Sequence, residues 1–294
     1  MTDLPDNEGN TTRAGRADRA MTVQKASVDE RVDVDPGLVR LVFGYVVCAT
    51  AWLLFGTGVG EYLGLTFVWP DLASVGWLSF GRLRPVHTNT VFWGWSSMGM
   101  LALAHYVVPR TCRTELHSHT MGWGALALFN LAVAAGVVQL LAGVNNGAQE
   151  YREFIWPVMG LFAVGMVLCA VNFYRTVATR ETDDIYITNW YVVSALLWTL
   201  TLVTVAYLPG YQDGIGQTII QGYYMHQGVG MWFTPMVLGI TYYVLPKLVN
   251  RPIHSYALGL LAFWTQLLFY SMIGSHHFVF APIPWWLQTV AIVF

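Results

Sequence analysis

The sequence predicts an all-α, polytopic membrane protein. Of its 294 residues, 55% are hydrophobic and only 11% are charged, whereas soluble domains carry about a quarter charged residues. The charges are also unevenly placed, since residues 1–36 hold 13 of the 32 Asp, Glu, Lys and Arg residues. The rest of the chain consists of long apolar runs without the short alternation of outer-membrane barrels. This pattern excludes a soluble enzyme, a secreted disulfide scaffold and a protein with a nucleic-acid partner.

Residues 1–36 are polar and charged, and no apolar run of the signal-peptide type adjoins them. We predict a disordered cytoplasmic tail here and a transmembrane domain over residues 37–294. Within this domain, seven apolar runs approach the roughly 20 residues that a helix needs to cross a bilayer. Pro, Gly, Asn and charged residues mark the turns between them. The predicted spans cover residues 38–60, 86–109, 118–143, 154–175, 187–208, 215–246 and 255–279.

An eighth apolar run begins at Pro284 and stops at Phe294. As a helix it would extend about 16 Å, roughly half of the hydrocarbon thickness. A helix that ended there would leave backbone carbonyls without partners inside the bilayer. We therefore expect seven full spans plus a truncated eighth, in a chain that is incomplete or that needs a partner for the rest of its fold.

The basic residues predict how the chain is oriented, because cytoplasmic loops carry an excess of Lys and Arg. With the N-terminus in the cytoplasm, twelve of the 15 Lys and Arg residues fall on the cytoplasmic side and three fall outside. This bias predicts a multi-pass protein with a cytoplasmic N-terminus. The three outside residues are Arg82, Arg84 and Arg152.

Histidines supply the candidate metal ligands. His226 lies in the middle of the sixth span, about 15 Å from its outer end at 1.5 Å per residue, and His276 and His277 are adjacent near the outer end of the seventh. Because consecutive spans are antiparallel neighbours, the three imidazoles are expected to converge. Such a set suits copper, zinc or iron. Adjacent histidines can share one ion only where the helix is distorted, and Gly274 would allow that distortion.

Two further residues have the chemistry of a redox site. Tyr270 precedes His277 by seven residues, two turns away on the same helix face, where a phenol can donate a proton and an electron beside a metal. His87 opens the second span directly after Arg82 and Arg84. This arrangement suits an axial haem ligand with a guanidinium that pairs with a propionate. Taken singly, each of these residues also fits ordinary packing.

Together these motifs resemble haem–copper oxidase subunit I. The resemblance rests on the stretch SFGRLRPVHTNTVFWG, the ITNWY that opens the fifth span, the sixth-span histidine and the Tyr-x5-His-His of the seventh span. The most similar branch is the catalytic subunit of the cbb3-type cytochrome c oxidase. The resemblance covers about residues 38–294, which correspond to the N-terminal two-thirds of a family chain with twelve spans.

The resemblance implies a role for each candidate residue. It makes His87 an axial ligand of the low-spin haem b and Arg84 the arginine that binds a propionate. Tyr270 becomes the tyrosine that cross-links to the sixth-span histidine in this branch. The active-site copper is assigned to His226, His276 and His277.

The resemblance also implies an activity, cofactors and partners. The family reduces O2 to water with electrons from cytochrome c and translocates protons, using low-spin and high-spin haem b and copper. Its partners are membrane-anchored cytochrome c-type haem subunits and soluble cytochrome c, and its place is the lipid bilayer of the bacterial inner membrane. The chain departs from the family at Gly222-Tyr223, where a Trp pair is usual, and at Ser275, where Pro is frequent. The remaining haem ligands of the family lie on a later span.

Two alternatives remain at this point. A nitric oxide reductase of the same superfamily binds iron at the three histidines and uses an added glutamate, but the residue four after His226 is Gly230. Tyr270 is present, as the oxidase requires, so both features favour the oxidase. The other alternative is a non-catalytic membrane protein, such as a transporter or a truncated fragment, which a haem spectrum of the purified protein would identify.

Overall fold

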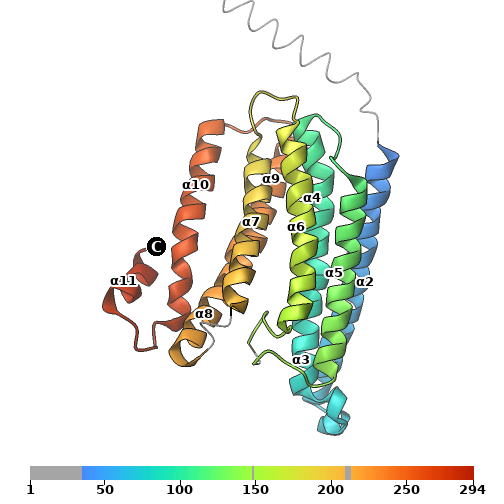
Figure 1. Ribbon diagram of the computed structural model, residues 1–294, viewed down its shortest axis with the longest axis vertical. Coiled ribbons are helices and arrows are strands. Elements are labelled where there is room, and N and C mark those ends of the chain that lie inside the picture. The colour runs from blue at the N-terminus through green and yellow to red at the C-terminus, as the bar shows by residue number, and fades with distance from the viewer. Residues whose placement is uncertain (1–34, 148, 209–212) are drawn as a thin grey trace, which may run out of the picture. The chain divides into compact units, whose positions relative to one another are not determined.

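The computed structural model describes residues 35–147, 149–208 and 213–294, so most of the predicted tail lies outside the described residues. Seven helical spans in the described part are long and apolar enough to cross a membrane, and a shorter helix, α11 (Trp285–Val293), follows them. The described residues contain no β-strand. The predicted all-α multi-pass fold, with seven full spans and a short eighth, is confirmed (Figure 1).

The spans are built from the following elements. The first is α2 (Pro36–Thr66), which leads through two 3-10 turns, η1 (Pro70–Ser74) and η2 (Gly76–Leu78), to the second. The second combines α3 (Phe80–Asn89), the π-helical turn η3 (Thr90–Ser96) and α4 (Ser97–Cys112). The next three are α5 (His119–Leu141), α6 (Trp156–Ala178) and α7 (Ile187–Tyr207). The sixth combines α8 (Gly214–Gln227), the π-helical turn η5 (Gly228–Phe233) and α9 (Thr234–Leu248). The seventh is α10 (Tyr256–Ile273) with the 3-10 turn η6 (Gly274–Phe278).

The first two spans are longer than the apolar runs that predicted them. α2 continues beyond residue 60 to Thr66. The second span begins at Phe80 rather than residue 86, and so takes two arginines into its first turns. Both arginines have partners there: Arg82 donates to the last backbone carbonyl of α5 at 2.8 Å, and Arg84 pairs with Glu150 at 2.9 Å. Because hydropathy does not register such partners, it placed the start of this span too late.

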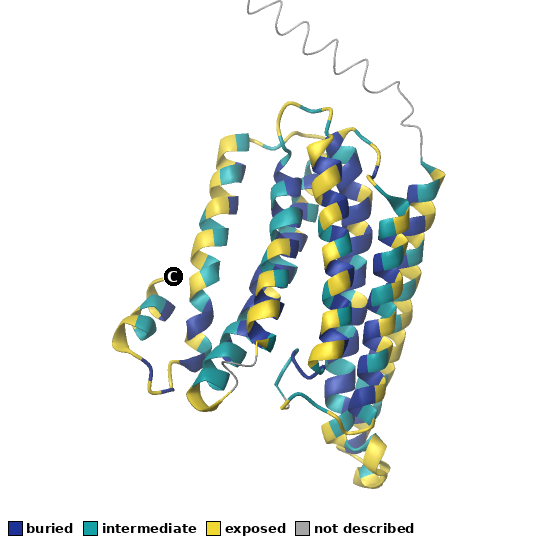
Figure 2. Cartoon of the chain, in the orientation of Figure 1, coloured by how far each residue is buried: buried dark blue, intermediate teal, exposed yellow. Residues whose placement is uncertain are grey.

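The helices pack into a bundle with the most extensive contacts between α5 and α6 and between α7 and α9. Aromatic rings fill its centre, where Phe162 contacts Trp93 at 5.0 Å and Phe129 at 4.6 Å between ring centroids. α2 and α10 lie at opposite edges of the bundle (Figure 1) and are largely exposed (Figure 2). Their exposed side chains are mainly apolar, as expected for helices whose outer faces meet lipid.

π-helical turns interrupt the two spans that carry His87 and His226. η3 begins three residues after His87, and η5 begins two residues after His226. The two turns face each other, because the rings of Phe92 in η3 and Phe233 in η5 lie 4.3 Å apart. Such turns widen the helix locally, change the direction of nearby side chains and occur frequently at functional sites. Nothing in the hydrophobic pattern signals them.

Candidate metal centre

The structure brings together three histidines from the sixth and seventh spans. His226 is the second-last residue of α8, and His276 and His277 lie in η6. Their ligand atoms lie within 4.8 Å of one another, and Nδ1 of His226 is 3.0 Å from Nε2 of His277. Nε2 of His226 is buried and has no hydrogen-bond partner among the described residues. Three imidazole side chains at this spacing match the donor set of a metal site.

The adjacent His276 and His277 lie in η6, just past the end of α10, and both of their rings are close to His226. In an α-helix, adjacent side chains diverge by about 100°. Here the α-helix ends at Ile273, and the chain continues from Gly274 in the tighter 3-10 form. The rings of His276 and His277 lie 4.5 Å apart, and they lie 4.5 and 5.1 Å from the ring of His226. His276 is exposed and His277 half-buried.

Tyr270 lies beside this cluster. Its ring centroid is 5.0 Å from that of His226, with the rings tilted by 31°. The ring occupies the space over Gly230 in η5, where even a Cβ atom would overlap it. A side chain at position 230 and the Tyr270 ring in this position therefore exclude each other.

His87 is held by different partners, on α2. Its Nδ1 lies 2.7 Å from the carbonyl oxygen of Gly56, which can only accept, so Nδ1 donates this hydrogen bond and Nε2 takes no part in it. Gly60 lies against the same ring, since a Cβ there would be 2.7 Å from Cε1 of His87. Histidines that bind metals usually donate their second ring N–H to a carbonyl or a carboxylate. The ring of His87 is oriented as such a ligand would be.

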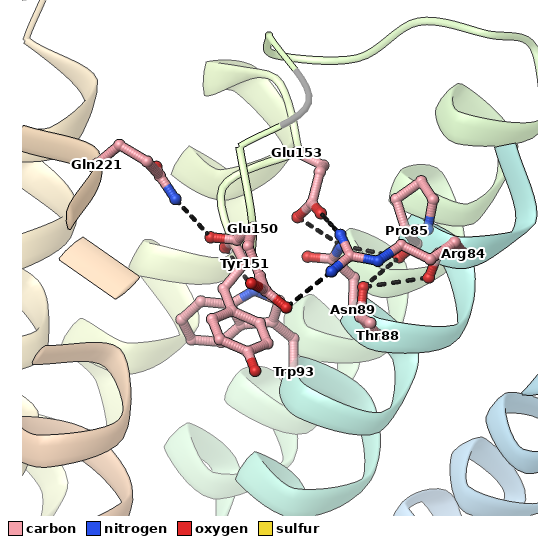
Figure 3. Close-up of polar contacts among 9 residues, drawn as sticks. All are labelled: Arg84, Pro85, Thr88, Asn89, Trp93, Glu150, Tyr151, Glu153 and Gln221. Carbon is pink, nitrogen blue, oxygen red and sulfur yellow. Dashed lines mark hydrogen bonds and ion pairs between the residues drawn. The ribbon is translucent and has the colours of Figure 1, made fainter. Parts of the chain in front are cut away.

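Arg84 lies in a charged network with the loop that precedes α6 (Figure 3). Its Nη2 is 2.9 Å from Oε1 of Glu150, and its Nη1 is 3.6 Å from Oε1 of Glu153. Asn89 donates to Oε2 of Glu153 at 2.9 Å, and Gln221 of α8 donates to the backbone carbonyl of Glu150 at 3.0 Å. The network therefore ties the loop both to the helix that carries His87 and to the helix that carries His226.

Comparison with known proteins identifies the family. The family described as "Cytochrome C and Quinol oxidase polypeptide I" matches residues 40–294. This chain belongs to the haem–copper oxidase subunit I family. It is 31% identical over 268 residues to the "Cbb3-type cytochrome c oxidase subunit CcoN1" of Stutzerimonas stutzeri, covering 86% of this chain and 56% of the relative. It is 33% identical over 265 residues to a "Cytochrome c oxidase subunit 1 homolog" of Agrobacterium tumefaciens (strain T37), covering 86% and 49%.

The similarity of this haem–copper oxidase chain to its relatives is limited in length and extends to a second kind of enzyme. The chain spans about half the length of the curated relatives it matches, which is less than the two-thirds that the resemblance predicted. One subunit of a nitric oxide reductase from Stutzerimonas stutzeri is also similar, but at 30% identity over 134 residues, which are 41% of this chain and 26% of that protein. Membership of the haem–copper oxidase family implies haem and copper cofactors.

Sequence reasoning missed several residues around the candidate site of this haem–copper oxidase subunit. Glu150 and Glu153 were not singled out, although they flank Arg152 in a predicted outer loop, on the side where Arg82 and Arg84 also lie, and so carried a signal. Gln227 follows a candidate ligand directly, yet an amide in a helix carries no specific signal. Its contact with α10 became visible only once the two helices were packed together.

Glu153 provides a prediction that does not depend on any cofactor. Burial raises the pKa of Glu153 above its usual value, while the hydrogen bond from Asn89 and the charge of Arg84 act in the opposite direction. A carboxyl whose pKa is higher in the folded state contributes stability at low pH, and this contribution is lost as the pH rises through that pKa. The thermal stability of the parent protein should therefore fall as the pH rises above about 4, the usual pKa of glutamate. The Glu153→Gln variant should not show this fall.

The measurement is the midpoint of thermal unfolding in detergent at a series of pH values. Glu150→Gln is the matched control, because this side chain is in the same loop and also faces Arg84, but is one-third exposed. It should keep a fall in stability in the same direction, but a smaller one, because the charge of Glu150 also raises the pKa of Glu153. Parallel curves for the parent protein and Glu153→Gln would show that Glu153 does not cause the dependence.

Proposed function

We propose that this chain forms the catalytic part of a respiratory terminal oxidase, which reduces O2 to water with electrons from cytochrome c and translocates protons. The observation that carries the proposal is the group of three histidines within 4.8 Å with the Tyr270 ring 5.0 Å from one of them. Relatives named as cytochrome c oxidase subunits support it.

The proposal assigns the three histidines of the cluster to copper and His87 to the iron of a low-spin haem b. The donor chemistry fits both, because imidazole is a ligand for copper and for haem iron, and Nδ1 of His87 donates to Gly56, which leaves Nε2 for the iron. When bound, low-spin and high-spin haem b and copper would supply the redox centres for oxygen reduction. The residues assigned to copper are His226, His276 and His277.

Two other side chains have roles in the proposal. The phenol of Tyr270 would donate a proton and an electron beside the histidine cluster, and a covalent bond to His226 would hold it there. Arg84 would bind a haem propionate. A guanidinium has five N–H donors, so Arg84 can keep its contacts with Glu150 and Glu153 and still offer donors to a propionate.

The position of Tyr270 also bears on the nitric oxide reductase alternative. A glutamate at position 230 would need the space that the Tyr270 ring occupies above Gly230. The similarity to the nitric oxide reductase chain covers 41% of this chain, against 86% for the cbb3-type subunit. Both observations favour oxygen as the substrate.

The proposed setting is the bacterial inner membrane, with the N-terminus in the cytoplasm. α2 begins at the end of the bundle where the loops after α4, α6 and α9 also lie (Figure 1). Those loops carry or adjoin Arg113, Arg180 and Arg251, so the positive-inside rule assigns this end to the cytoplasm. The proposed partners are membrane-anchored cytochrome c-type subunits and soluble cytochrome c.

The test is oxygen uptake by the purified membrane complex that contains the full-length protein, with reduced cytochrome c as donor. We expect stoichiometric copper, a haem b spectrum and oxygen uptake that exceeds the consumption of nitric oxide. Iron in place of copper, with faster turnover of nitric oxide, would show the reductase. A complex without a haem spectrum and without either activity would show a non-catalytic protein.

A further inference from the structure

The end of α10 is held by side chains from α8. The last four carbonyls of an α-helix lack partners within the helix, and in α10 these begin with Tyr270 and Ser271. Nε2 of Gln227 donates to the carbonyl oxygen of Tyr270 at 2.7 Å, and the hydroxyl of Tyr223 donates to the carbonyl oxygen of Ser271. Two side chains one helical turn apart on α8 thus bind two consecutive carbonyls on α10.

A third donor comes from η6 itself. The hydroxyl of Ser275 donates to the carbonyl oxygen of Met272 at 3.2 Å. Three of the last four carbonyls of α10 therefore bond to side chains. With these bonds the α-helix can end here while the carbonyl oxygens of its last turn keep hydrogen-bond donors. The chain then continues as the 3-10 turn that carries His276 and His277.

Two glycines make this close approach possible. A Cβ at Gly274 would lie 2.9 Å from Cδ2 of Tyr223 and 3.2 Å from Nε2 of Gln227. A Cβ at Gly222 would lie 2.8 Å from the ring of Phe278 and 3.1 Å from Cβ of His277. α8 and η6 are thus in direct contact on both sides of the point where the α-helix ends.

We infer that Gln227 and Tyr223 are positioning residues, which hold the carbonyl end of α10 so that His276 and His277 both turn toward His226. The inference rests on the proposed metal site. Gln227 directly follows His226, so one short segment of α8 carries one ligand and orients the other two. Gln227 is 2% exposed, so water cannot replace its bond to α10. Tyr223 stands where the family usually has one of its paired tryptophans, and its hydroxyl supplies the second donor.

The test compares Gln227→Met with the parent protein in the purified, assembled membrane complex. Methionine keeps the length of the side chain and removes the donor. We expect copper to bind about 10- to 100-fold more weakly in a chelator competition, the range typical for loss of a group that orients metal ligands. The Cu(II) electron paramagnetic resonance signal should change, while the content of haem stays the same. Tyr223→Phe, which removes only the hydroxyl, should shift both readouts in the same direction.

Gln221→Met is the matched control, because it removes the same kind of side-chain bond from the same helix. Gln221 donates to the backbone of Glu150 rather than to α10, so its loss should leave copper affinity and the Cu(II) signal unchanged. Unchanged affinity and signal in both Gln227→Met and Tyr223→Phe would overturn the inference. If Gln227→Met does not assemble, Tyr223→Phe decides the outcome. A parent protein without copper would instead contradict the proposed function.

Discussion

The His276→Ala variant should lose copper and oxygen reduction together, while its low-spin haem spectrum remains. Removing one of three imidazoles leaves two ligands, which would not retain copper through purification. His87 lies on α3 and is held by α2 through Gly56, so its site does not depend on η6. The measurements are metal analysis, reduced-minus-oxidised spectra and oxygen uptake of the purified complex.

A control for this experiment lies at the other end of the same span. His254 is exposed in the loop before α10, and His254→Ala should keep copper and activity. A His276→Ala complex with the normal copper content would exclude His276 as a ligand. Loss of the low-spin haem along with the copper would instead mean that the substitution disturbs the whole bundle.

Tyr270→Phe should retain haem and copper and yet abolish oxygen reduction. Four electrons are needed to reduce O2 to water without releasing peroxide, and in the proposed function the phenol supplies one electron and one proton. The substitution removes only the hydroxyl, since a phenylalanine ring can occupy the same space above Gly230 and beside His226. Oxygen uptake and metal content of the same preparation test this expectation.

Tyr256→Phe is the control on the same helix. Its hydroxyl donates to the backbone carbonyl of Ile185 at 2.8 Å, at the opposite end of α10, and its loss should leave activity unchanged. In the active parent protein, peptide mass spectrometry should find Tyr270 and His226 joined with the loss of two hydrogens. Separate unmodified peptides, together with full activity of Tyr270→Phe, would assign Tyr270 to packing alone.

In the two spans with the candidate ligands, the histidine cluster could be predicted from the sequence, but the contacts at the end of α10 could not. The sequence indicated that His226, His276 and His277 lie on neighbouring antiparallel spans, and that a distorted helix end near Gly274 was required for them to share an ion. It could not show what ends the helix there. The bonds from Gln227 and Tyr223 to α10 join residues more than 40 positions apart, and no local pattern encodes them.

By itself, the sequence determined the number of spans and the class of fold. This is possible because a segment in lipid must satisfy its backbone hydrogen bonds internally, so every long apolar run becomes a helix. Only the tertiary structure decided the start of the second span, the two π-helical turns, the partners of Arg84 and the fit of the Tyr270 ring against Gly230. Each of these depends on close contact between distant segments, where a single atom such as a Cβ determines the geometry, and hydropathy averaged over about 20 residues carries no record of such contacts.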